Sequence, residues 1–409
     1  MKMCKNLVRS LALSASIFLT ISSALAVEAR DAASRKIATE MRMFTDEGTT
    51  AGLVLLAADR ERVLSCTAVG WANIEKKIPM REDALFWIAS MTKPVTAVAL
   101  MMLVDEGKIS LDDPVSKYLP EFDAPQKIVS TAAEKLSVTN QTAVALVGNG
   151  AASTPTGVRT KPITLRQLLS NTSGLRFGAG EPSIDAFSLA EMASKAAKSN
   201  LLFEPGSDYS YSTLNFTVAG RVLEVVTGEA FEKFLQRRIF DPLEMSDTTF
   251  WPDTQQIARL ADTYAGDPKA HTLTAKNTPR LHYPLDDRER RHVAPGGGLF
   301  STAADIGKFG QMLLGRGAAH GRRLLSERAV AEMTSRQTPP NVKNNYGLGL
   351  GLNDGSFGHG GALSTDFIVY PQENLVAVFM VQKYAGWGTP DGGKMLPGFH
   401  RLVRELYKP

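Results

Sequence analysis

The sequence predicts an α+β fold, in which an antiparallel sheet is flanked by terminal helices and a mainly helical domain is inserted between the two halves of the sheet. Strand-like runs lie near both ends of the chain, at residues 51–58 and 62–71 and again at 365–370 and 375–381. A few polar residues separate the two runs of each pair, as in hairpins. We therefore expect the two chain ends to build one sheet.

Apolar residues at helical spacing predict the helices. One set precedes the first strand and one follows the last: Ala33, Ile37, Met41 and Phe44, then Phe399, Leu402, Val403 and Leu406. Helical patterns also fill the middle of the chain, at residues 91–106, 164–170, 189–198, 214–227 and 231–240. These patterns predict an α/β sheet domain formed by residues 27–104 and 296–409. A mainly helical domain spans residues 105–295, with a flexible insertion near 131–162.

The first 26 residues have the pattern of a signal peptide, which predicts an exported protein, periplasmic or secreted. The cations Lys2, Lys5 and Arg9 precede an apolar stretch, and Ala24 and Ala26 fit an A-x-A cleavage site. The stretch is short for a bilayer, so we expect no membrane span after signal cleavage. An uncleaved anchor is the alternative.

The charge balance and the histidines exclude several classes of function. Removing the three cations of the signal peptide from the formal net charge of +4 leaves +1, and both signs are evenly mixed. A nearly neutral protein has no electrostatic reason to bind nucleic acid. The six histidines show no metal-ligand spacing, so we expect neither a metal nor another cofactor.

Ser90 and Lys93 form an S-x-x-K pair at the start of the buried helix predicted over residues 91–106. Three residues apart, the two side chains project from the same side of the first turn. A serine hydroxyl becomes a nucleophile when a neighbour accepts its proton, and a lysine in an apolar site can do so because its ammonium form is disfavoured. On its own, however, the pair is better explained by a helix cap and a surface lysine.

Two further segments favour the catalytic interpretation. Tyr211 follows the turn at Pro205 and Gly206 and stands just before the helix predicted over residues 214–227, where a phenol can point into a cleft. A tyrosine buried in the core is the alternative. Residues 357–362, F-G-H-G-G-A, precede the strand at 365–370, and glycines at a strand edge let a ligand approach closely. An ordinary glycine turn with a surface histidine is the alternative there.

In this order, S-x-x-K, Y-S-x and H-x-G resemble the serine β-lactamase and penicillin-binding-protein superfamily, and within it the class C β-lactamases and family VIII carboxylesterases. Supporting segments match as well: residues 83–93 entering the nucleophile helix, L-L-S-N-T-S-G-L at 168–175 and G-G-G-L-F-S-T-A-A-D-I at 296–306. The resemblance covers most of the mature chain. It implies a β-lactamase/transpeptidase-like fold.

The resemblance also implies roles for individual residues. Ser90 would be acylated, Lys93 would share its proton, and Tyr211 would act as general base and later protonate the leaving group. The backbone amides of Ser90 and Ala362 would form the oxyanion hole. Whether Lys93 or Tyr211 takes the first proton stays open, because the two groups would titrate as a coupled unit.

Departures from the family pattern bear on the substrate. Thr213 stands where lactamases of this type usually carry Asn, and His359 replaces the usual Lys; together with Gly360 and Gly361 they are the expected substrate-binding residues. Histidine is mostly neutral at pH 7, so a fixed positive charge for a substrate carboxylate is lost. Uncharged esters are therefore favoured over penicillins and cephalosporins. Asn171 replaces a common His, with no consequence that the sequence reveals.

We therefore expect a serine hydrolase that acts through an acyl-enzyme on a small ester or amide, and specifically a carboxylesterase of short-chain uncharged esters. A β-lactamase or D-amino-acid peptidase is the alternative within the same chemistry. A penicillin-binding or sensor protein that is acylated without turnover belongs to another class, and acyl transfer to an alcohol is a further option. The natural substrate and the oligomeric state are not readable from the sequence.

Overall fold

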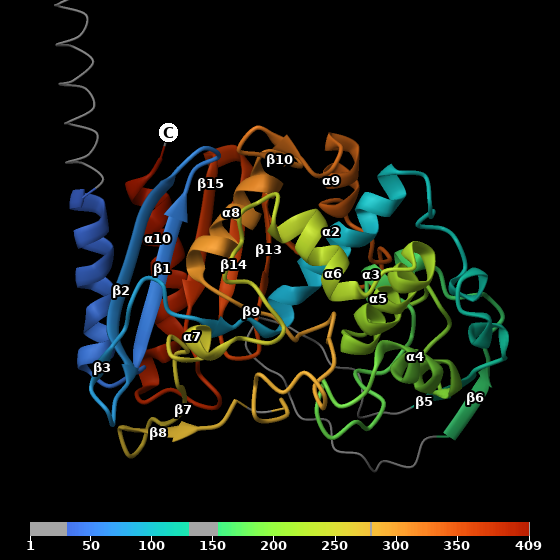
Figure 1. Cartoon of the computed structure of the whole chain (residues 1–409), viewed down its shortest axis with the longest axis horizontal. Helices are drawn as coiled ribbons and strands as arrows, with labels where there is room; N and C mark the ends of the chain where they lie inside the picture. Colours follow the sequence, from blue (N-terminus) through green and yellow to red (C-terminus); the bar gives the residue numbers. More distant parts are fainter. Residues whose placement is uncertain (1–30, 131–153, 279, 409) are drawn as a thin grey trace, which may run out of the picture.

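The computed structural model describes residues 31–130, 154–278 and 280–408, and its largest element is a seven-stranded antiparallel sheet (Figure 1). The strand order is β12-β13-β14-β15-β1-β2-β3. The strands are β1 (Gly52–Ala58), β2 (Val63–Asn73), β3 (Ile78–Pro79), β12 (Gly351–Asn353), β13 (Ser356–Gly360), β14 (Asp366–Tyr370) and β15 (Leu375–Met380). Because β15 pairs with β1, placing Val54 opposite Met380, the two ends of the chain meet in the middle of the sheet. The predicted antiparallel sheet is confirmed.

Helices cover both faces of this sheet. The helix of residues 31–46 and α10 (Met395–Leu406) lie on one face, where Ile37, Met41 and Phe399 are buried with Leu55. On the other face lies α8 (Ala303–Leu314), drawn in orange in Figure 1. A Cβ at Gly310 of α8 would lie 2.5 Å from a methyl group of Val376 in β15. Only glycine therefore permits so close an approach of helix and sheet.

The helices of the middle region gather at the far end of α2 (Thr92–Asp105), to the right in Figure 1. They are α3 (Leu165–Leu169), α4 (Leu189–Lys198), α5 (Thr213–Thr227) and α6 (Phe231–Leu235). Two short helices lie apart from this group: α7 (Thr254–Ile257) lies on the side of the sheet, and α9 (Glu327–Met333) contacts α2 (Figure 1). The helix predicted over residues 231–240 continues after Leu235 as a π-helical turn, Gln236–Phe240. The first twelve residues of α2 are buried, so this helix is the core around which the others pack.

Short strand pairs complete the chain. They are β4 (Phe86–Trp87) with β9 (Phe300–Ser301), β5 (Lys127–Ser130) with β6 (Thr154–Val158), β7 (Thr263–Asp267) with β8 (Thr272–Lys276), and β10 (Ala318–Ala319) with β11 (Arg322–Arg323). Strand β6 lies within the region near 131–162 where the sequence predicts a flexible insertion. Its sequence, T-P-T-G-V, has no apolar alternation, so only the pairing with β5 reveals it. Residues 131–153 and the predicted signal peptide, 1–26, lie outside the described residues and stay predictions.

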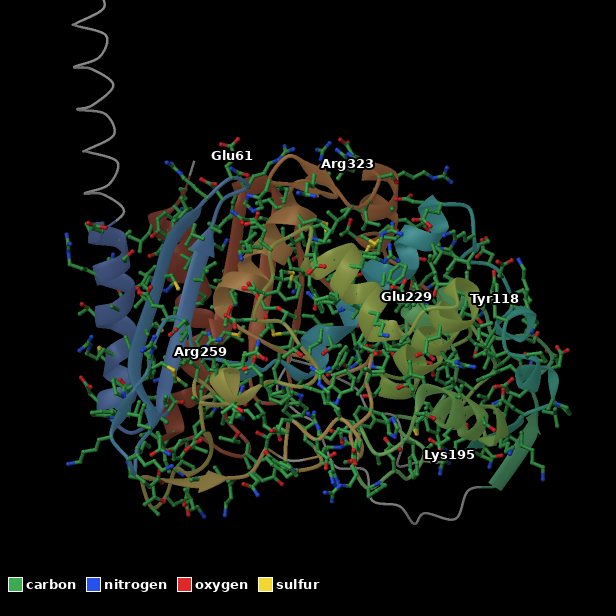
Figure 2. The ribbon with its side chains drawn as sticks, in the orientation of Figure 1. Glu61, Tyr118, Lys195, Glu229, Arg259 and Arg323 are labelled. Carbon is green, nitrogen blue, oxygen red and sulfur yellow. The ribbon has the colours of Figure 1, made fainter. Side chains whose placement is uncertain are left out.

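Charged side chains of both signs are spread over the molecule (Figure 2). Many pair locally, as Arg237 does with Glu229 at 2.6 Å and Arg259 with Asp247. Among the helices that the structure describes, none combines the length and apolar character that crossing a bilayer requires.

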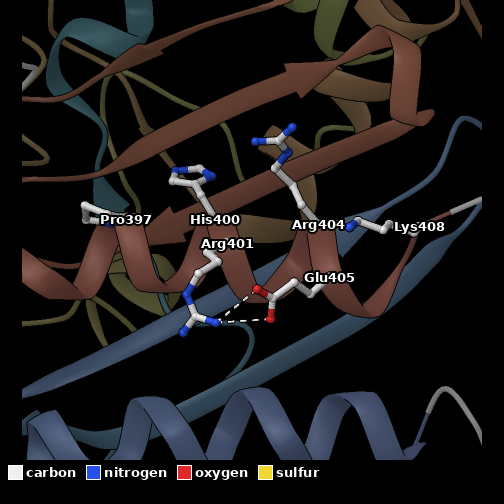
Figure 3. A pocket seen from close by; sticks show the side chains of 6 residues that line it. All are labelled: Pro397, His400, Arg401, Arg404, Glu405 and Lys408. Carbon is white, nitrogen blue, oxygen red and sulfur yellow. Dashed lines mark hydrogen bonds and ion pairs between the residues drawn. The ribbon is translucent and has the colours of Figure 1, made fainter.

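A pocket of about 370 Å³ opens on the surface of α10 and is lined by Pro397, His400, Arg401, Arg404, Glu405 and Lys408 (Figure 3). Its two guanidinium groups are already neutralised, because Arg401 pairs with Glu405 at 3.1 Å and Arg404 pairs with Glu373 at 2.5 Å. The helices α10 and α2 pack into separate cores on opposite faces of the sheet. This pocket is therefore remote from the serine helix.

Candidate active site

Ser90 lies on a single 3₁₀ turn, η1 (Ala89–Met91), which leads directly into α2. Ala89 has a left-handed φ of 45°, which a residue with a Cβ adopts only under constraint. Two hydrogen bonds provide that constraint: Thr92 Oγ1 donates to Ala89 O at 2.7 Å and accepts from Leu299 N at 3.2 Å. The half-buried Ser90 is thus held in a fixed place at the start of a buried helix.

Lys93 brings its amine to the serine hydroxyl. Its Nζ lies 3.1 Å from Ser90 Oγ and donates to Gly296 O at 2.5 Å. The side chain is wholly buried, and burial, followed by the positive charge of Arg280, lowers the pKa of Lys93 well below its ordinary value. A neutral amine next to a hydroxyl is able to accept its proton.

Tyr211 completes the cluster from a different part of the chain. The Lys93 Nζ lies 4.6 Å from the centroid of the Tyr211 ring, and the Ser90 side chain is near enough to the phenol to act on its pKa. Burial raises the pKa of the phenol, and the neighbouring Ser90 side chain only partly offsets this effect. The phenol therefore keeps its proton at neutral pH. The structure thus brings together all three residues that the sequence singled out for chemistry.

Asn171 positions the segment that carries Tyr211, a role that the sequence did not reveal. Its backbone carbonyl accepts from Ser210 N, and its Oδ1 accepts from Ser212 N, both at 3.0 Å. The same Oδ1 accepts from Asn215 Nδ2 at 3.0 Å. Asn171 itself is fully buried, in a left-handed conformation with φ of 59° that asparagine tolerates well. The residues on both sides of the phenol are therefore fixed to one residue, Ser210 to the backbone carbonyl of Asn171 and Ser212 to its side chain.

Replacing Asn171 by alanine is expected to destabilise the protein by about 1–3 kcal/mol, because a buried N–H and a buried amide each lose their acceptor. It should also lower kcat for an ester more than it changes KM, since the phenol loses its support. Urea unfolding and ester kinetics measure the two effects. Asn353→Ala, at an exposed position of β12, is the matched control. Wild-type kcat in a destabilised Asn171→Ala protein would contradict the positioning role.

The glycine-rich edge at the end of β13 lies directly against the nucleophile turn. Thr365 Oγ1 lies 3.5 Å from Ile88 O, and a Cβ at Gly361 would lie only 2.6 Å from that carbonyl. Ala362 packs in the same apolar cluster as Ala89. Gly360 is half-buried and Gly361 is buried. The strand edge predicted to contact the substrate is therefore next to Ser90.

His359 is buried beside this edge, and both of its ring nitrogens have protein partners. Its Nδ1 lies 2.7 Å from Gly360 O and its Nε2 lies 3.1 Å from the Tyr346 hydroxyl. A carbonyl only accepts, so these contacts imply that Nδ1 carries the proton and Tyr346 donates to Nε2. Burial, followed by the charge of Lys93, lowers the pKa of His359 to about 3. The imidazole is therefore neutral at pH 7.

Thr213 is the first residue of α5 and lies against Gly296, where an added Cβ would be 2.5 Å from Thr213 Cγ2. Gly296 is also the residue whose carbonyl accepts from Lys93. Thr213 thus touches the wall of the site rather than a distant surface. Within the part of the chain that the structure describes, no group of three or more His, Cys, Asp or Glu side chains is arranged to hold a metal ion.

Comparisons with known proteins identify the family of this chain. A family model described as beta-lactamase matches residues 35–391. Lovastatin esterase of Penicillium rubens is 28% identical over 394 residues, which cover 84% of this chain and 92% of that enzyme.

Two solved structures share the fold. EstCE1, described as a hydrolase with promiscuous acyltransferase activity, superposes with a TM-score of 0.69 at 22% identity, covering 94% of this chain and 99% of that one. A variant of simvastatin synthase from Aspergillus terreus gives a TM-score of 0.72 at 21% identity, covering 93% and 97%. The family model spans most of the chain, and the chain therefore belongs to the beta-lactamase family.

Proposed function

We propose that the protein is a carboxylesterase that cleaves short-chain, uncharged carboxylic esters through an acyl-enzyme on Ser90. The observation that carries the proposal is the buried amine of Lys93, 3.1 Å from the Ser90 hydroxyl. A lysine buried in this way is costly unless its amine is neutral, and a neutral amine beside a hydroxyl is a base in position. A helix cap with a surface lysine would leave the amine in solvent.

The opposite pKa shifts of Lys93 and Tyr211 support the following order of proton transfers. Lys93, with its lowered pKa, accepts the Ser90 proton as Oγ forms a bond to the ester carbonyl carbon. Tyr211, with its raised pKa, gives its proton to the leaving alcohol as the carbon–oxygen bond breaks, and regains one from Lys93. Water then attacks the acyl carbon and gives a proton to Lys93, the bond from that carbon to Ser90 Oγ breaks, and Oγ receives a proton from the same two groups. The products are an alcohol and a carboxylic acid.

The carbonyl oxygen becomes negative in the tetrahedral intermediate and needs donors that are fixed in advance. The backbone amides of Ser90 and Ala362 are the proposed donors. Support comes from the contact between the β13 edge and Ile88, which precedes the nucleophile turn, and from the strained backbone at Ala89. Both features hold the main chain of this region rigid.

The substrate class follows from the neutral histidine. His359 has a pKa of about 3 and both of its nitrogens are engaged, so it offers a substrate carboxylate no positive charge. A site that binds β-lactams or C-terminal D-amino acids needs such a charge, whereas a simple ester does not. The relationship to lovastatin esterase and the fold shared with EstCE1 also favour ester chemistry.

A panel of substrates tests the proposal. The protein is offered p-nitrophenyl acetate and butyrate, nitrocefin and a D-alanyl dipeptide, with Ser90→Ala as the inactive reference. We expect the highest kcat/KM for the two esters, and no turnover above background by the variant. Faster turnover of nitrocefin would mean that the protein is a β-lactamase, and faster turnover of the dipeptide would mean that it is a peptidase. A stoichiometric adduct without turnover would mean that the protein is a sensor and not an enzyme.

A further inference from the structure

Arg280 places a cation beside the proposed site, on the far side of an aromatic stack. The Cζ of Arg280 lies 5.0 Å from the centroid of the Phe177 ring. Phe177 in turn stacks on Tyr211, with ring centroids 6.3 Å apart and an angle of 28° between the planes. One aromatic ring therefore separates the guanidinium from the phenol that is proposed to protonate the leaving alcohol.

The backbone of Arg280 is held rigidly. Its carbonyl accepts from Ile184 N at 3.0 Å, and its own φ is 65°, in the left-handed region. The next residue, Leu281, is buried in the apolar cluster that contains Ala89 and Ala362. Arg280 is thus attached to the wall of the site.

A buried ion pair anchors the loop that follows Arg280. Arg291 Nε donates to the Asp185 carboxylate at 2.8 Å, and His282 N donates to the same carboxylate at 3.1 Å. The side chains of Asp185 and Arg291 are each 1% exposed. Because such an anchor fixes the loop two residues after Arg280, little conformational freedom is lost when the guanidinium binds a ligand.

The guanidinium has no carboxylate partner of its own. Among the described residues Arg280 forms no ion pair, and the charge of Glu181 only partly offsets the effect of burial on its pKa. Burial lowers the pKa of Arg280, but an arginine remains charged at neutral pH. Its charge is also felt at the amine of Lys93. A half-buried cation without a paired anion is a strong site for a carboxylate.

We infer that Arg280 is a specificity-determining residue that binds an anionic group on the alcohol part of the ester, which extends the proposed function from uncharged esters to monoanionic ones. The inference rests on the proposed function, because it uses Tyr211 to locate the leaving alcohol. In the proposed mechanism the leaving alcohol lies next to the Tyr211 phenol. The Arg280 guanidinium lies on the other side of the Phe177 ring, which stacks on that phenol. A planar carboxylate on that alcohol would meet the planar guanidinium in bidentate fashion.

A matched pair of esters tests this inference. The acetate ester of 4-hydroxybenzoate carries a carboxylate on its alcohol part, and the acetate ester of 4-hydroxybenzamide has the same shape without the charge. We expect wild-type protein to prefer the anionic ester, and Arg280→Gln to reduce this preference about 10–100-fold. Arg280→Lys should restore part of it, and the preference should weaken as salt is added.

Controls locate the effect. Arg316→Gln, which removes an exposed arginine, should leave the preference unchanged. The pair p-nitrophenyl hydrogen glutarate and p-nitrophenyl pentanoate carries the charge difference on the acyl part, and Arg280→Gln should not alter its ratio. An unchanged ratio for the benzoate pair, or an effect confined to the glutarate pair, would overturn the inference.

Binding separates this inference from the proposed function. Calorimetry with Ser90→Ala measures the affinity for 4-hydroxybenzoate and for 4-hydroxybenzamide without any turnover. Tighter binding of the anion, lost when Arg280→Gln is added, supports the inference even if the wild type cleaves no ester. Equal binding of the two compounds would refute it even if the wild type is an active esterase.

Discussion

Lys93→Met is expected to lower kcat/KM for p-nitrophenyl butyrate by about 10⁴-fold, because catalytic groups that act as a unit fail together when one of them is removed. Methionine keeps the length and apolar packing of the buried side chain but cannot accept the Ser90 proton. The fall should therefore appear in kcat, with KM little changed. Steady-state kinetics with wild type and variant measure it. A variant within tenfold of wild type would remove Lys93 from the proton transfer.

The same substitution should change how stability depends on pH. Burial lowers the pKa of Lys93 in the folded state, whereas the unfolded chain has the ordinary value near 10.4. Between the two values the unfolded state binds a proton that the folded state lacks, so wild-type stability rises with pH across this window. Methionine has no such proton. The free energy of unfolding of Lys93→Met, relative to wild type, should therefore decrease steadily as the pH rises toward about 10.

Urea unfolding at several pH values between 6 and 9 gives this difference directly. The variant also loses the hydrogen bond to Gly296, and the stability lost with that bond does not depend on pH. This loss shifts the whole plot of the stability difference against pH and leaves its slope unchanged. Lys269→Met, at an exposed lysine, should show no slope. If the difference in unfolding free energy between Lys93→Met and wild type did not change with pH, the buried amine would keep its proton in the folded state.

The sheet could be predicted because its central strands are continuous apolar runs. All of β1 and β15 are buried, and in the sequence both are short apolar runs of strand length with a polar turn beside them. β13 was not predicted as a strand, because S-F-G-H-G has glycine at alternate positions and no apolar alternation. Its partner β14 shows it to be a strand, with Gly360 opposite Asp366. The pairing of β13 with β14 depends on how two separate segments lie in the folded protein. The sequence of β13 alone therefore cannot reveal it.

The same distinction applies to the site. Ser90 and Lys93 are three residues apart, so the helix itself brings them together and the sequence reveals the pair. Tyr211 came from the family pattern. Asn171 and Arg280 were missed because their importance lies in contacts with segments about 40 and 100 residues away in the chain, at Ser212 and Phe177. Asn171 differs from the common His of the family segment, but that difference carries no information about its contacts, and nothing in the local sequence distinguishes Arg280 from other polar loop residues.

Tyr211→Phe is expected to affect esters according to their leaving group. The substitution removes only the hydroxyl, so the ring can still stack on Phe177 and lie near the Lys93 amine, and the fold should be unchanged. An ethanol leaving group needs a proton, whereas p-nitrophenolate leaves without one. We expect kcat/KM for ethyl butyrate to fall about 10³-fold, because general acid catalysis contributes about 10²–10⁴-fold. The fall for p-nitrophenyl butyrate should be much smaller.

The ratio of the two losses is the informative quantity. A purely structural defect at Tyr211 would slow both esters equally, whereas the loss of a proton donor slows only the ester with the basic leaving group. Tyr384→Phe, which removes a hydroxyl from an exposed tyrosine, should change neither rate. Equal losses for the two esters in Tyr211→Phe would show that the phenol does not protonate the leaving group. Lys93 would then have to deliver the proton itself, which its amine can do because it has just taken that proton from Ser90.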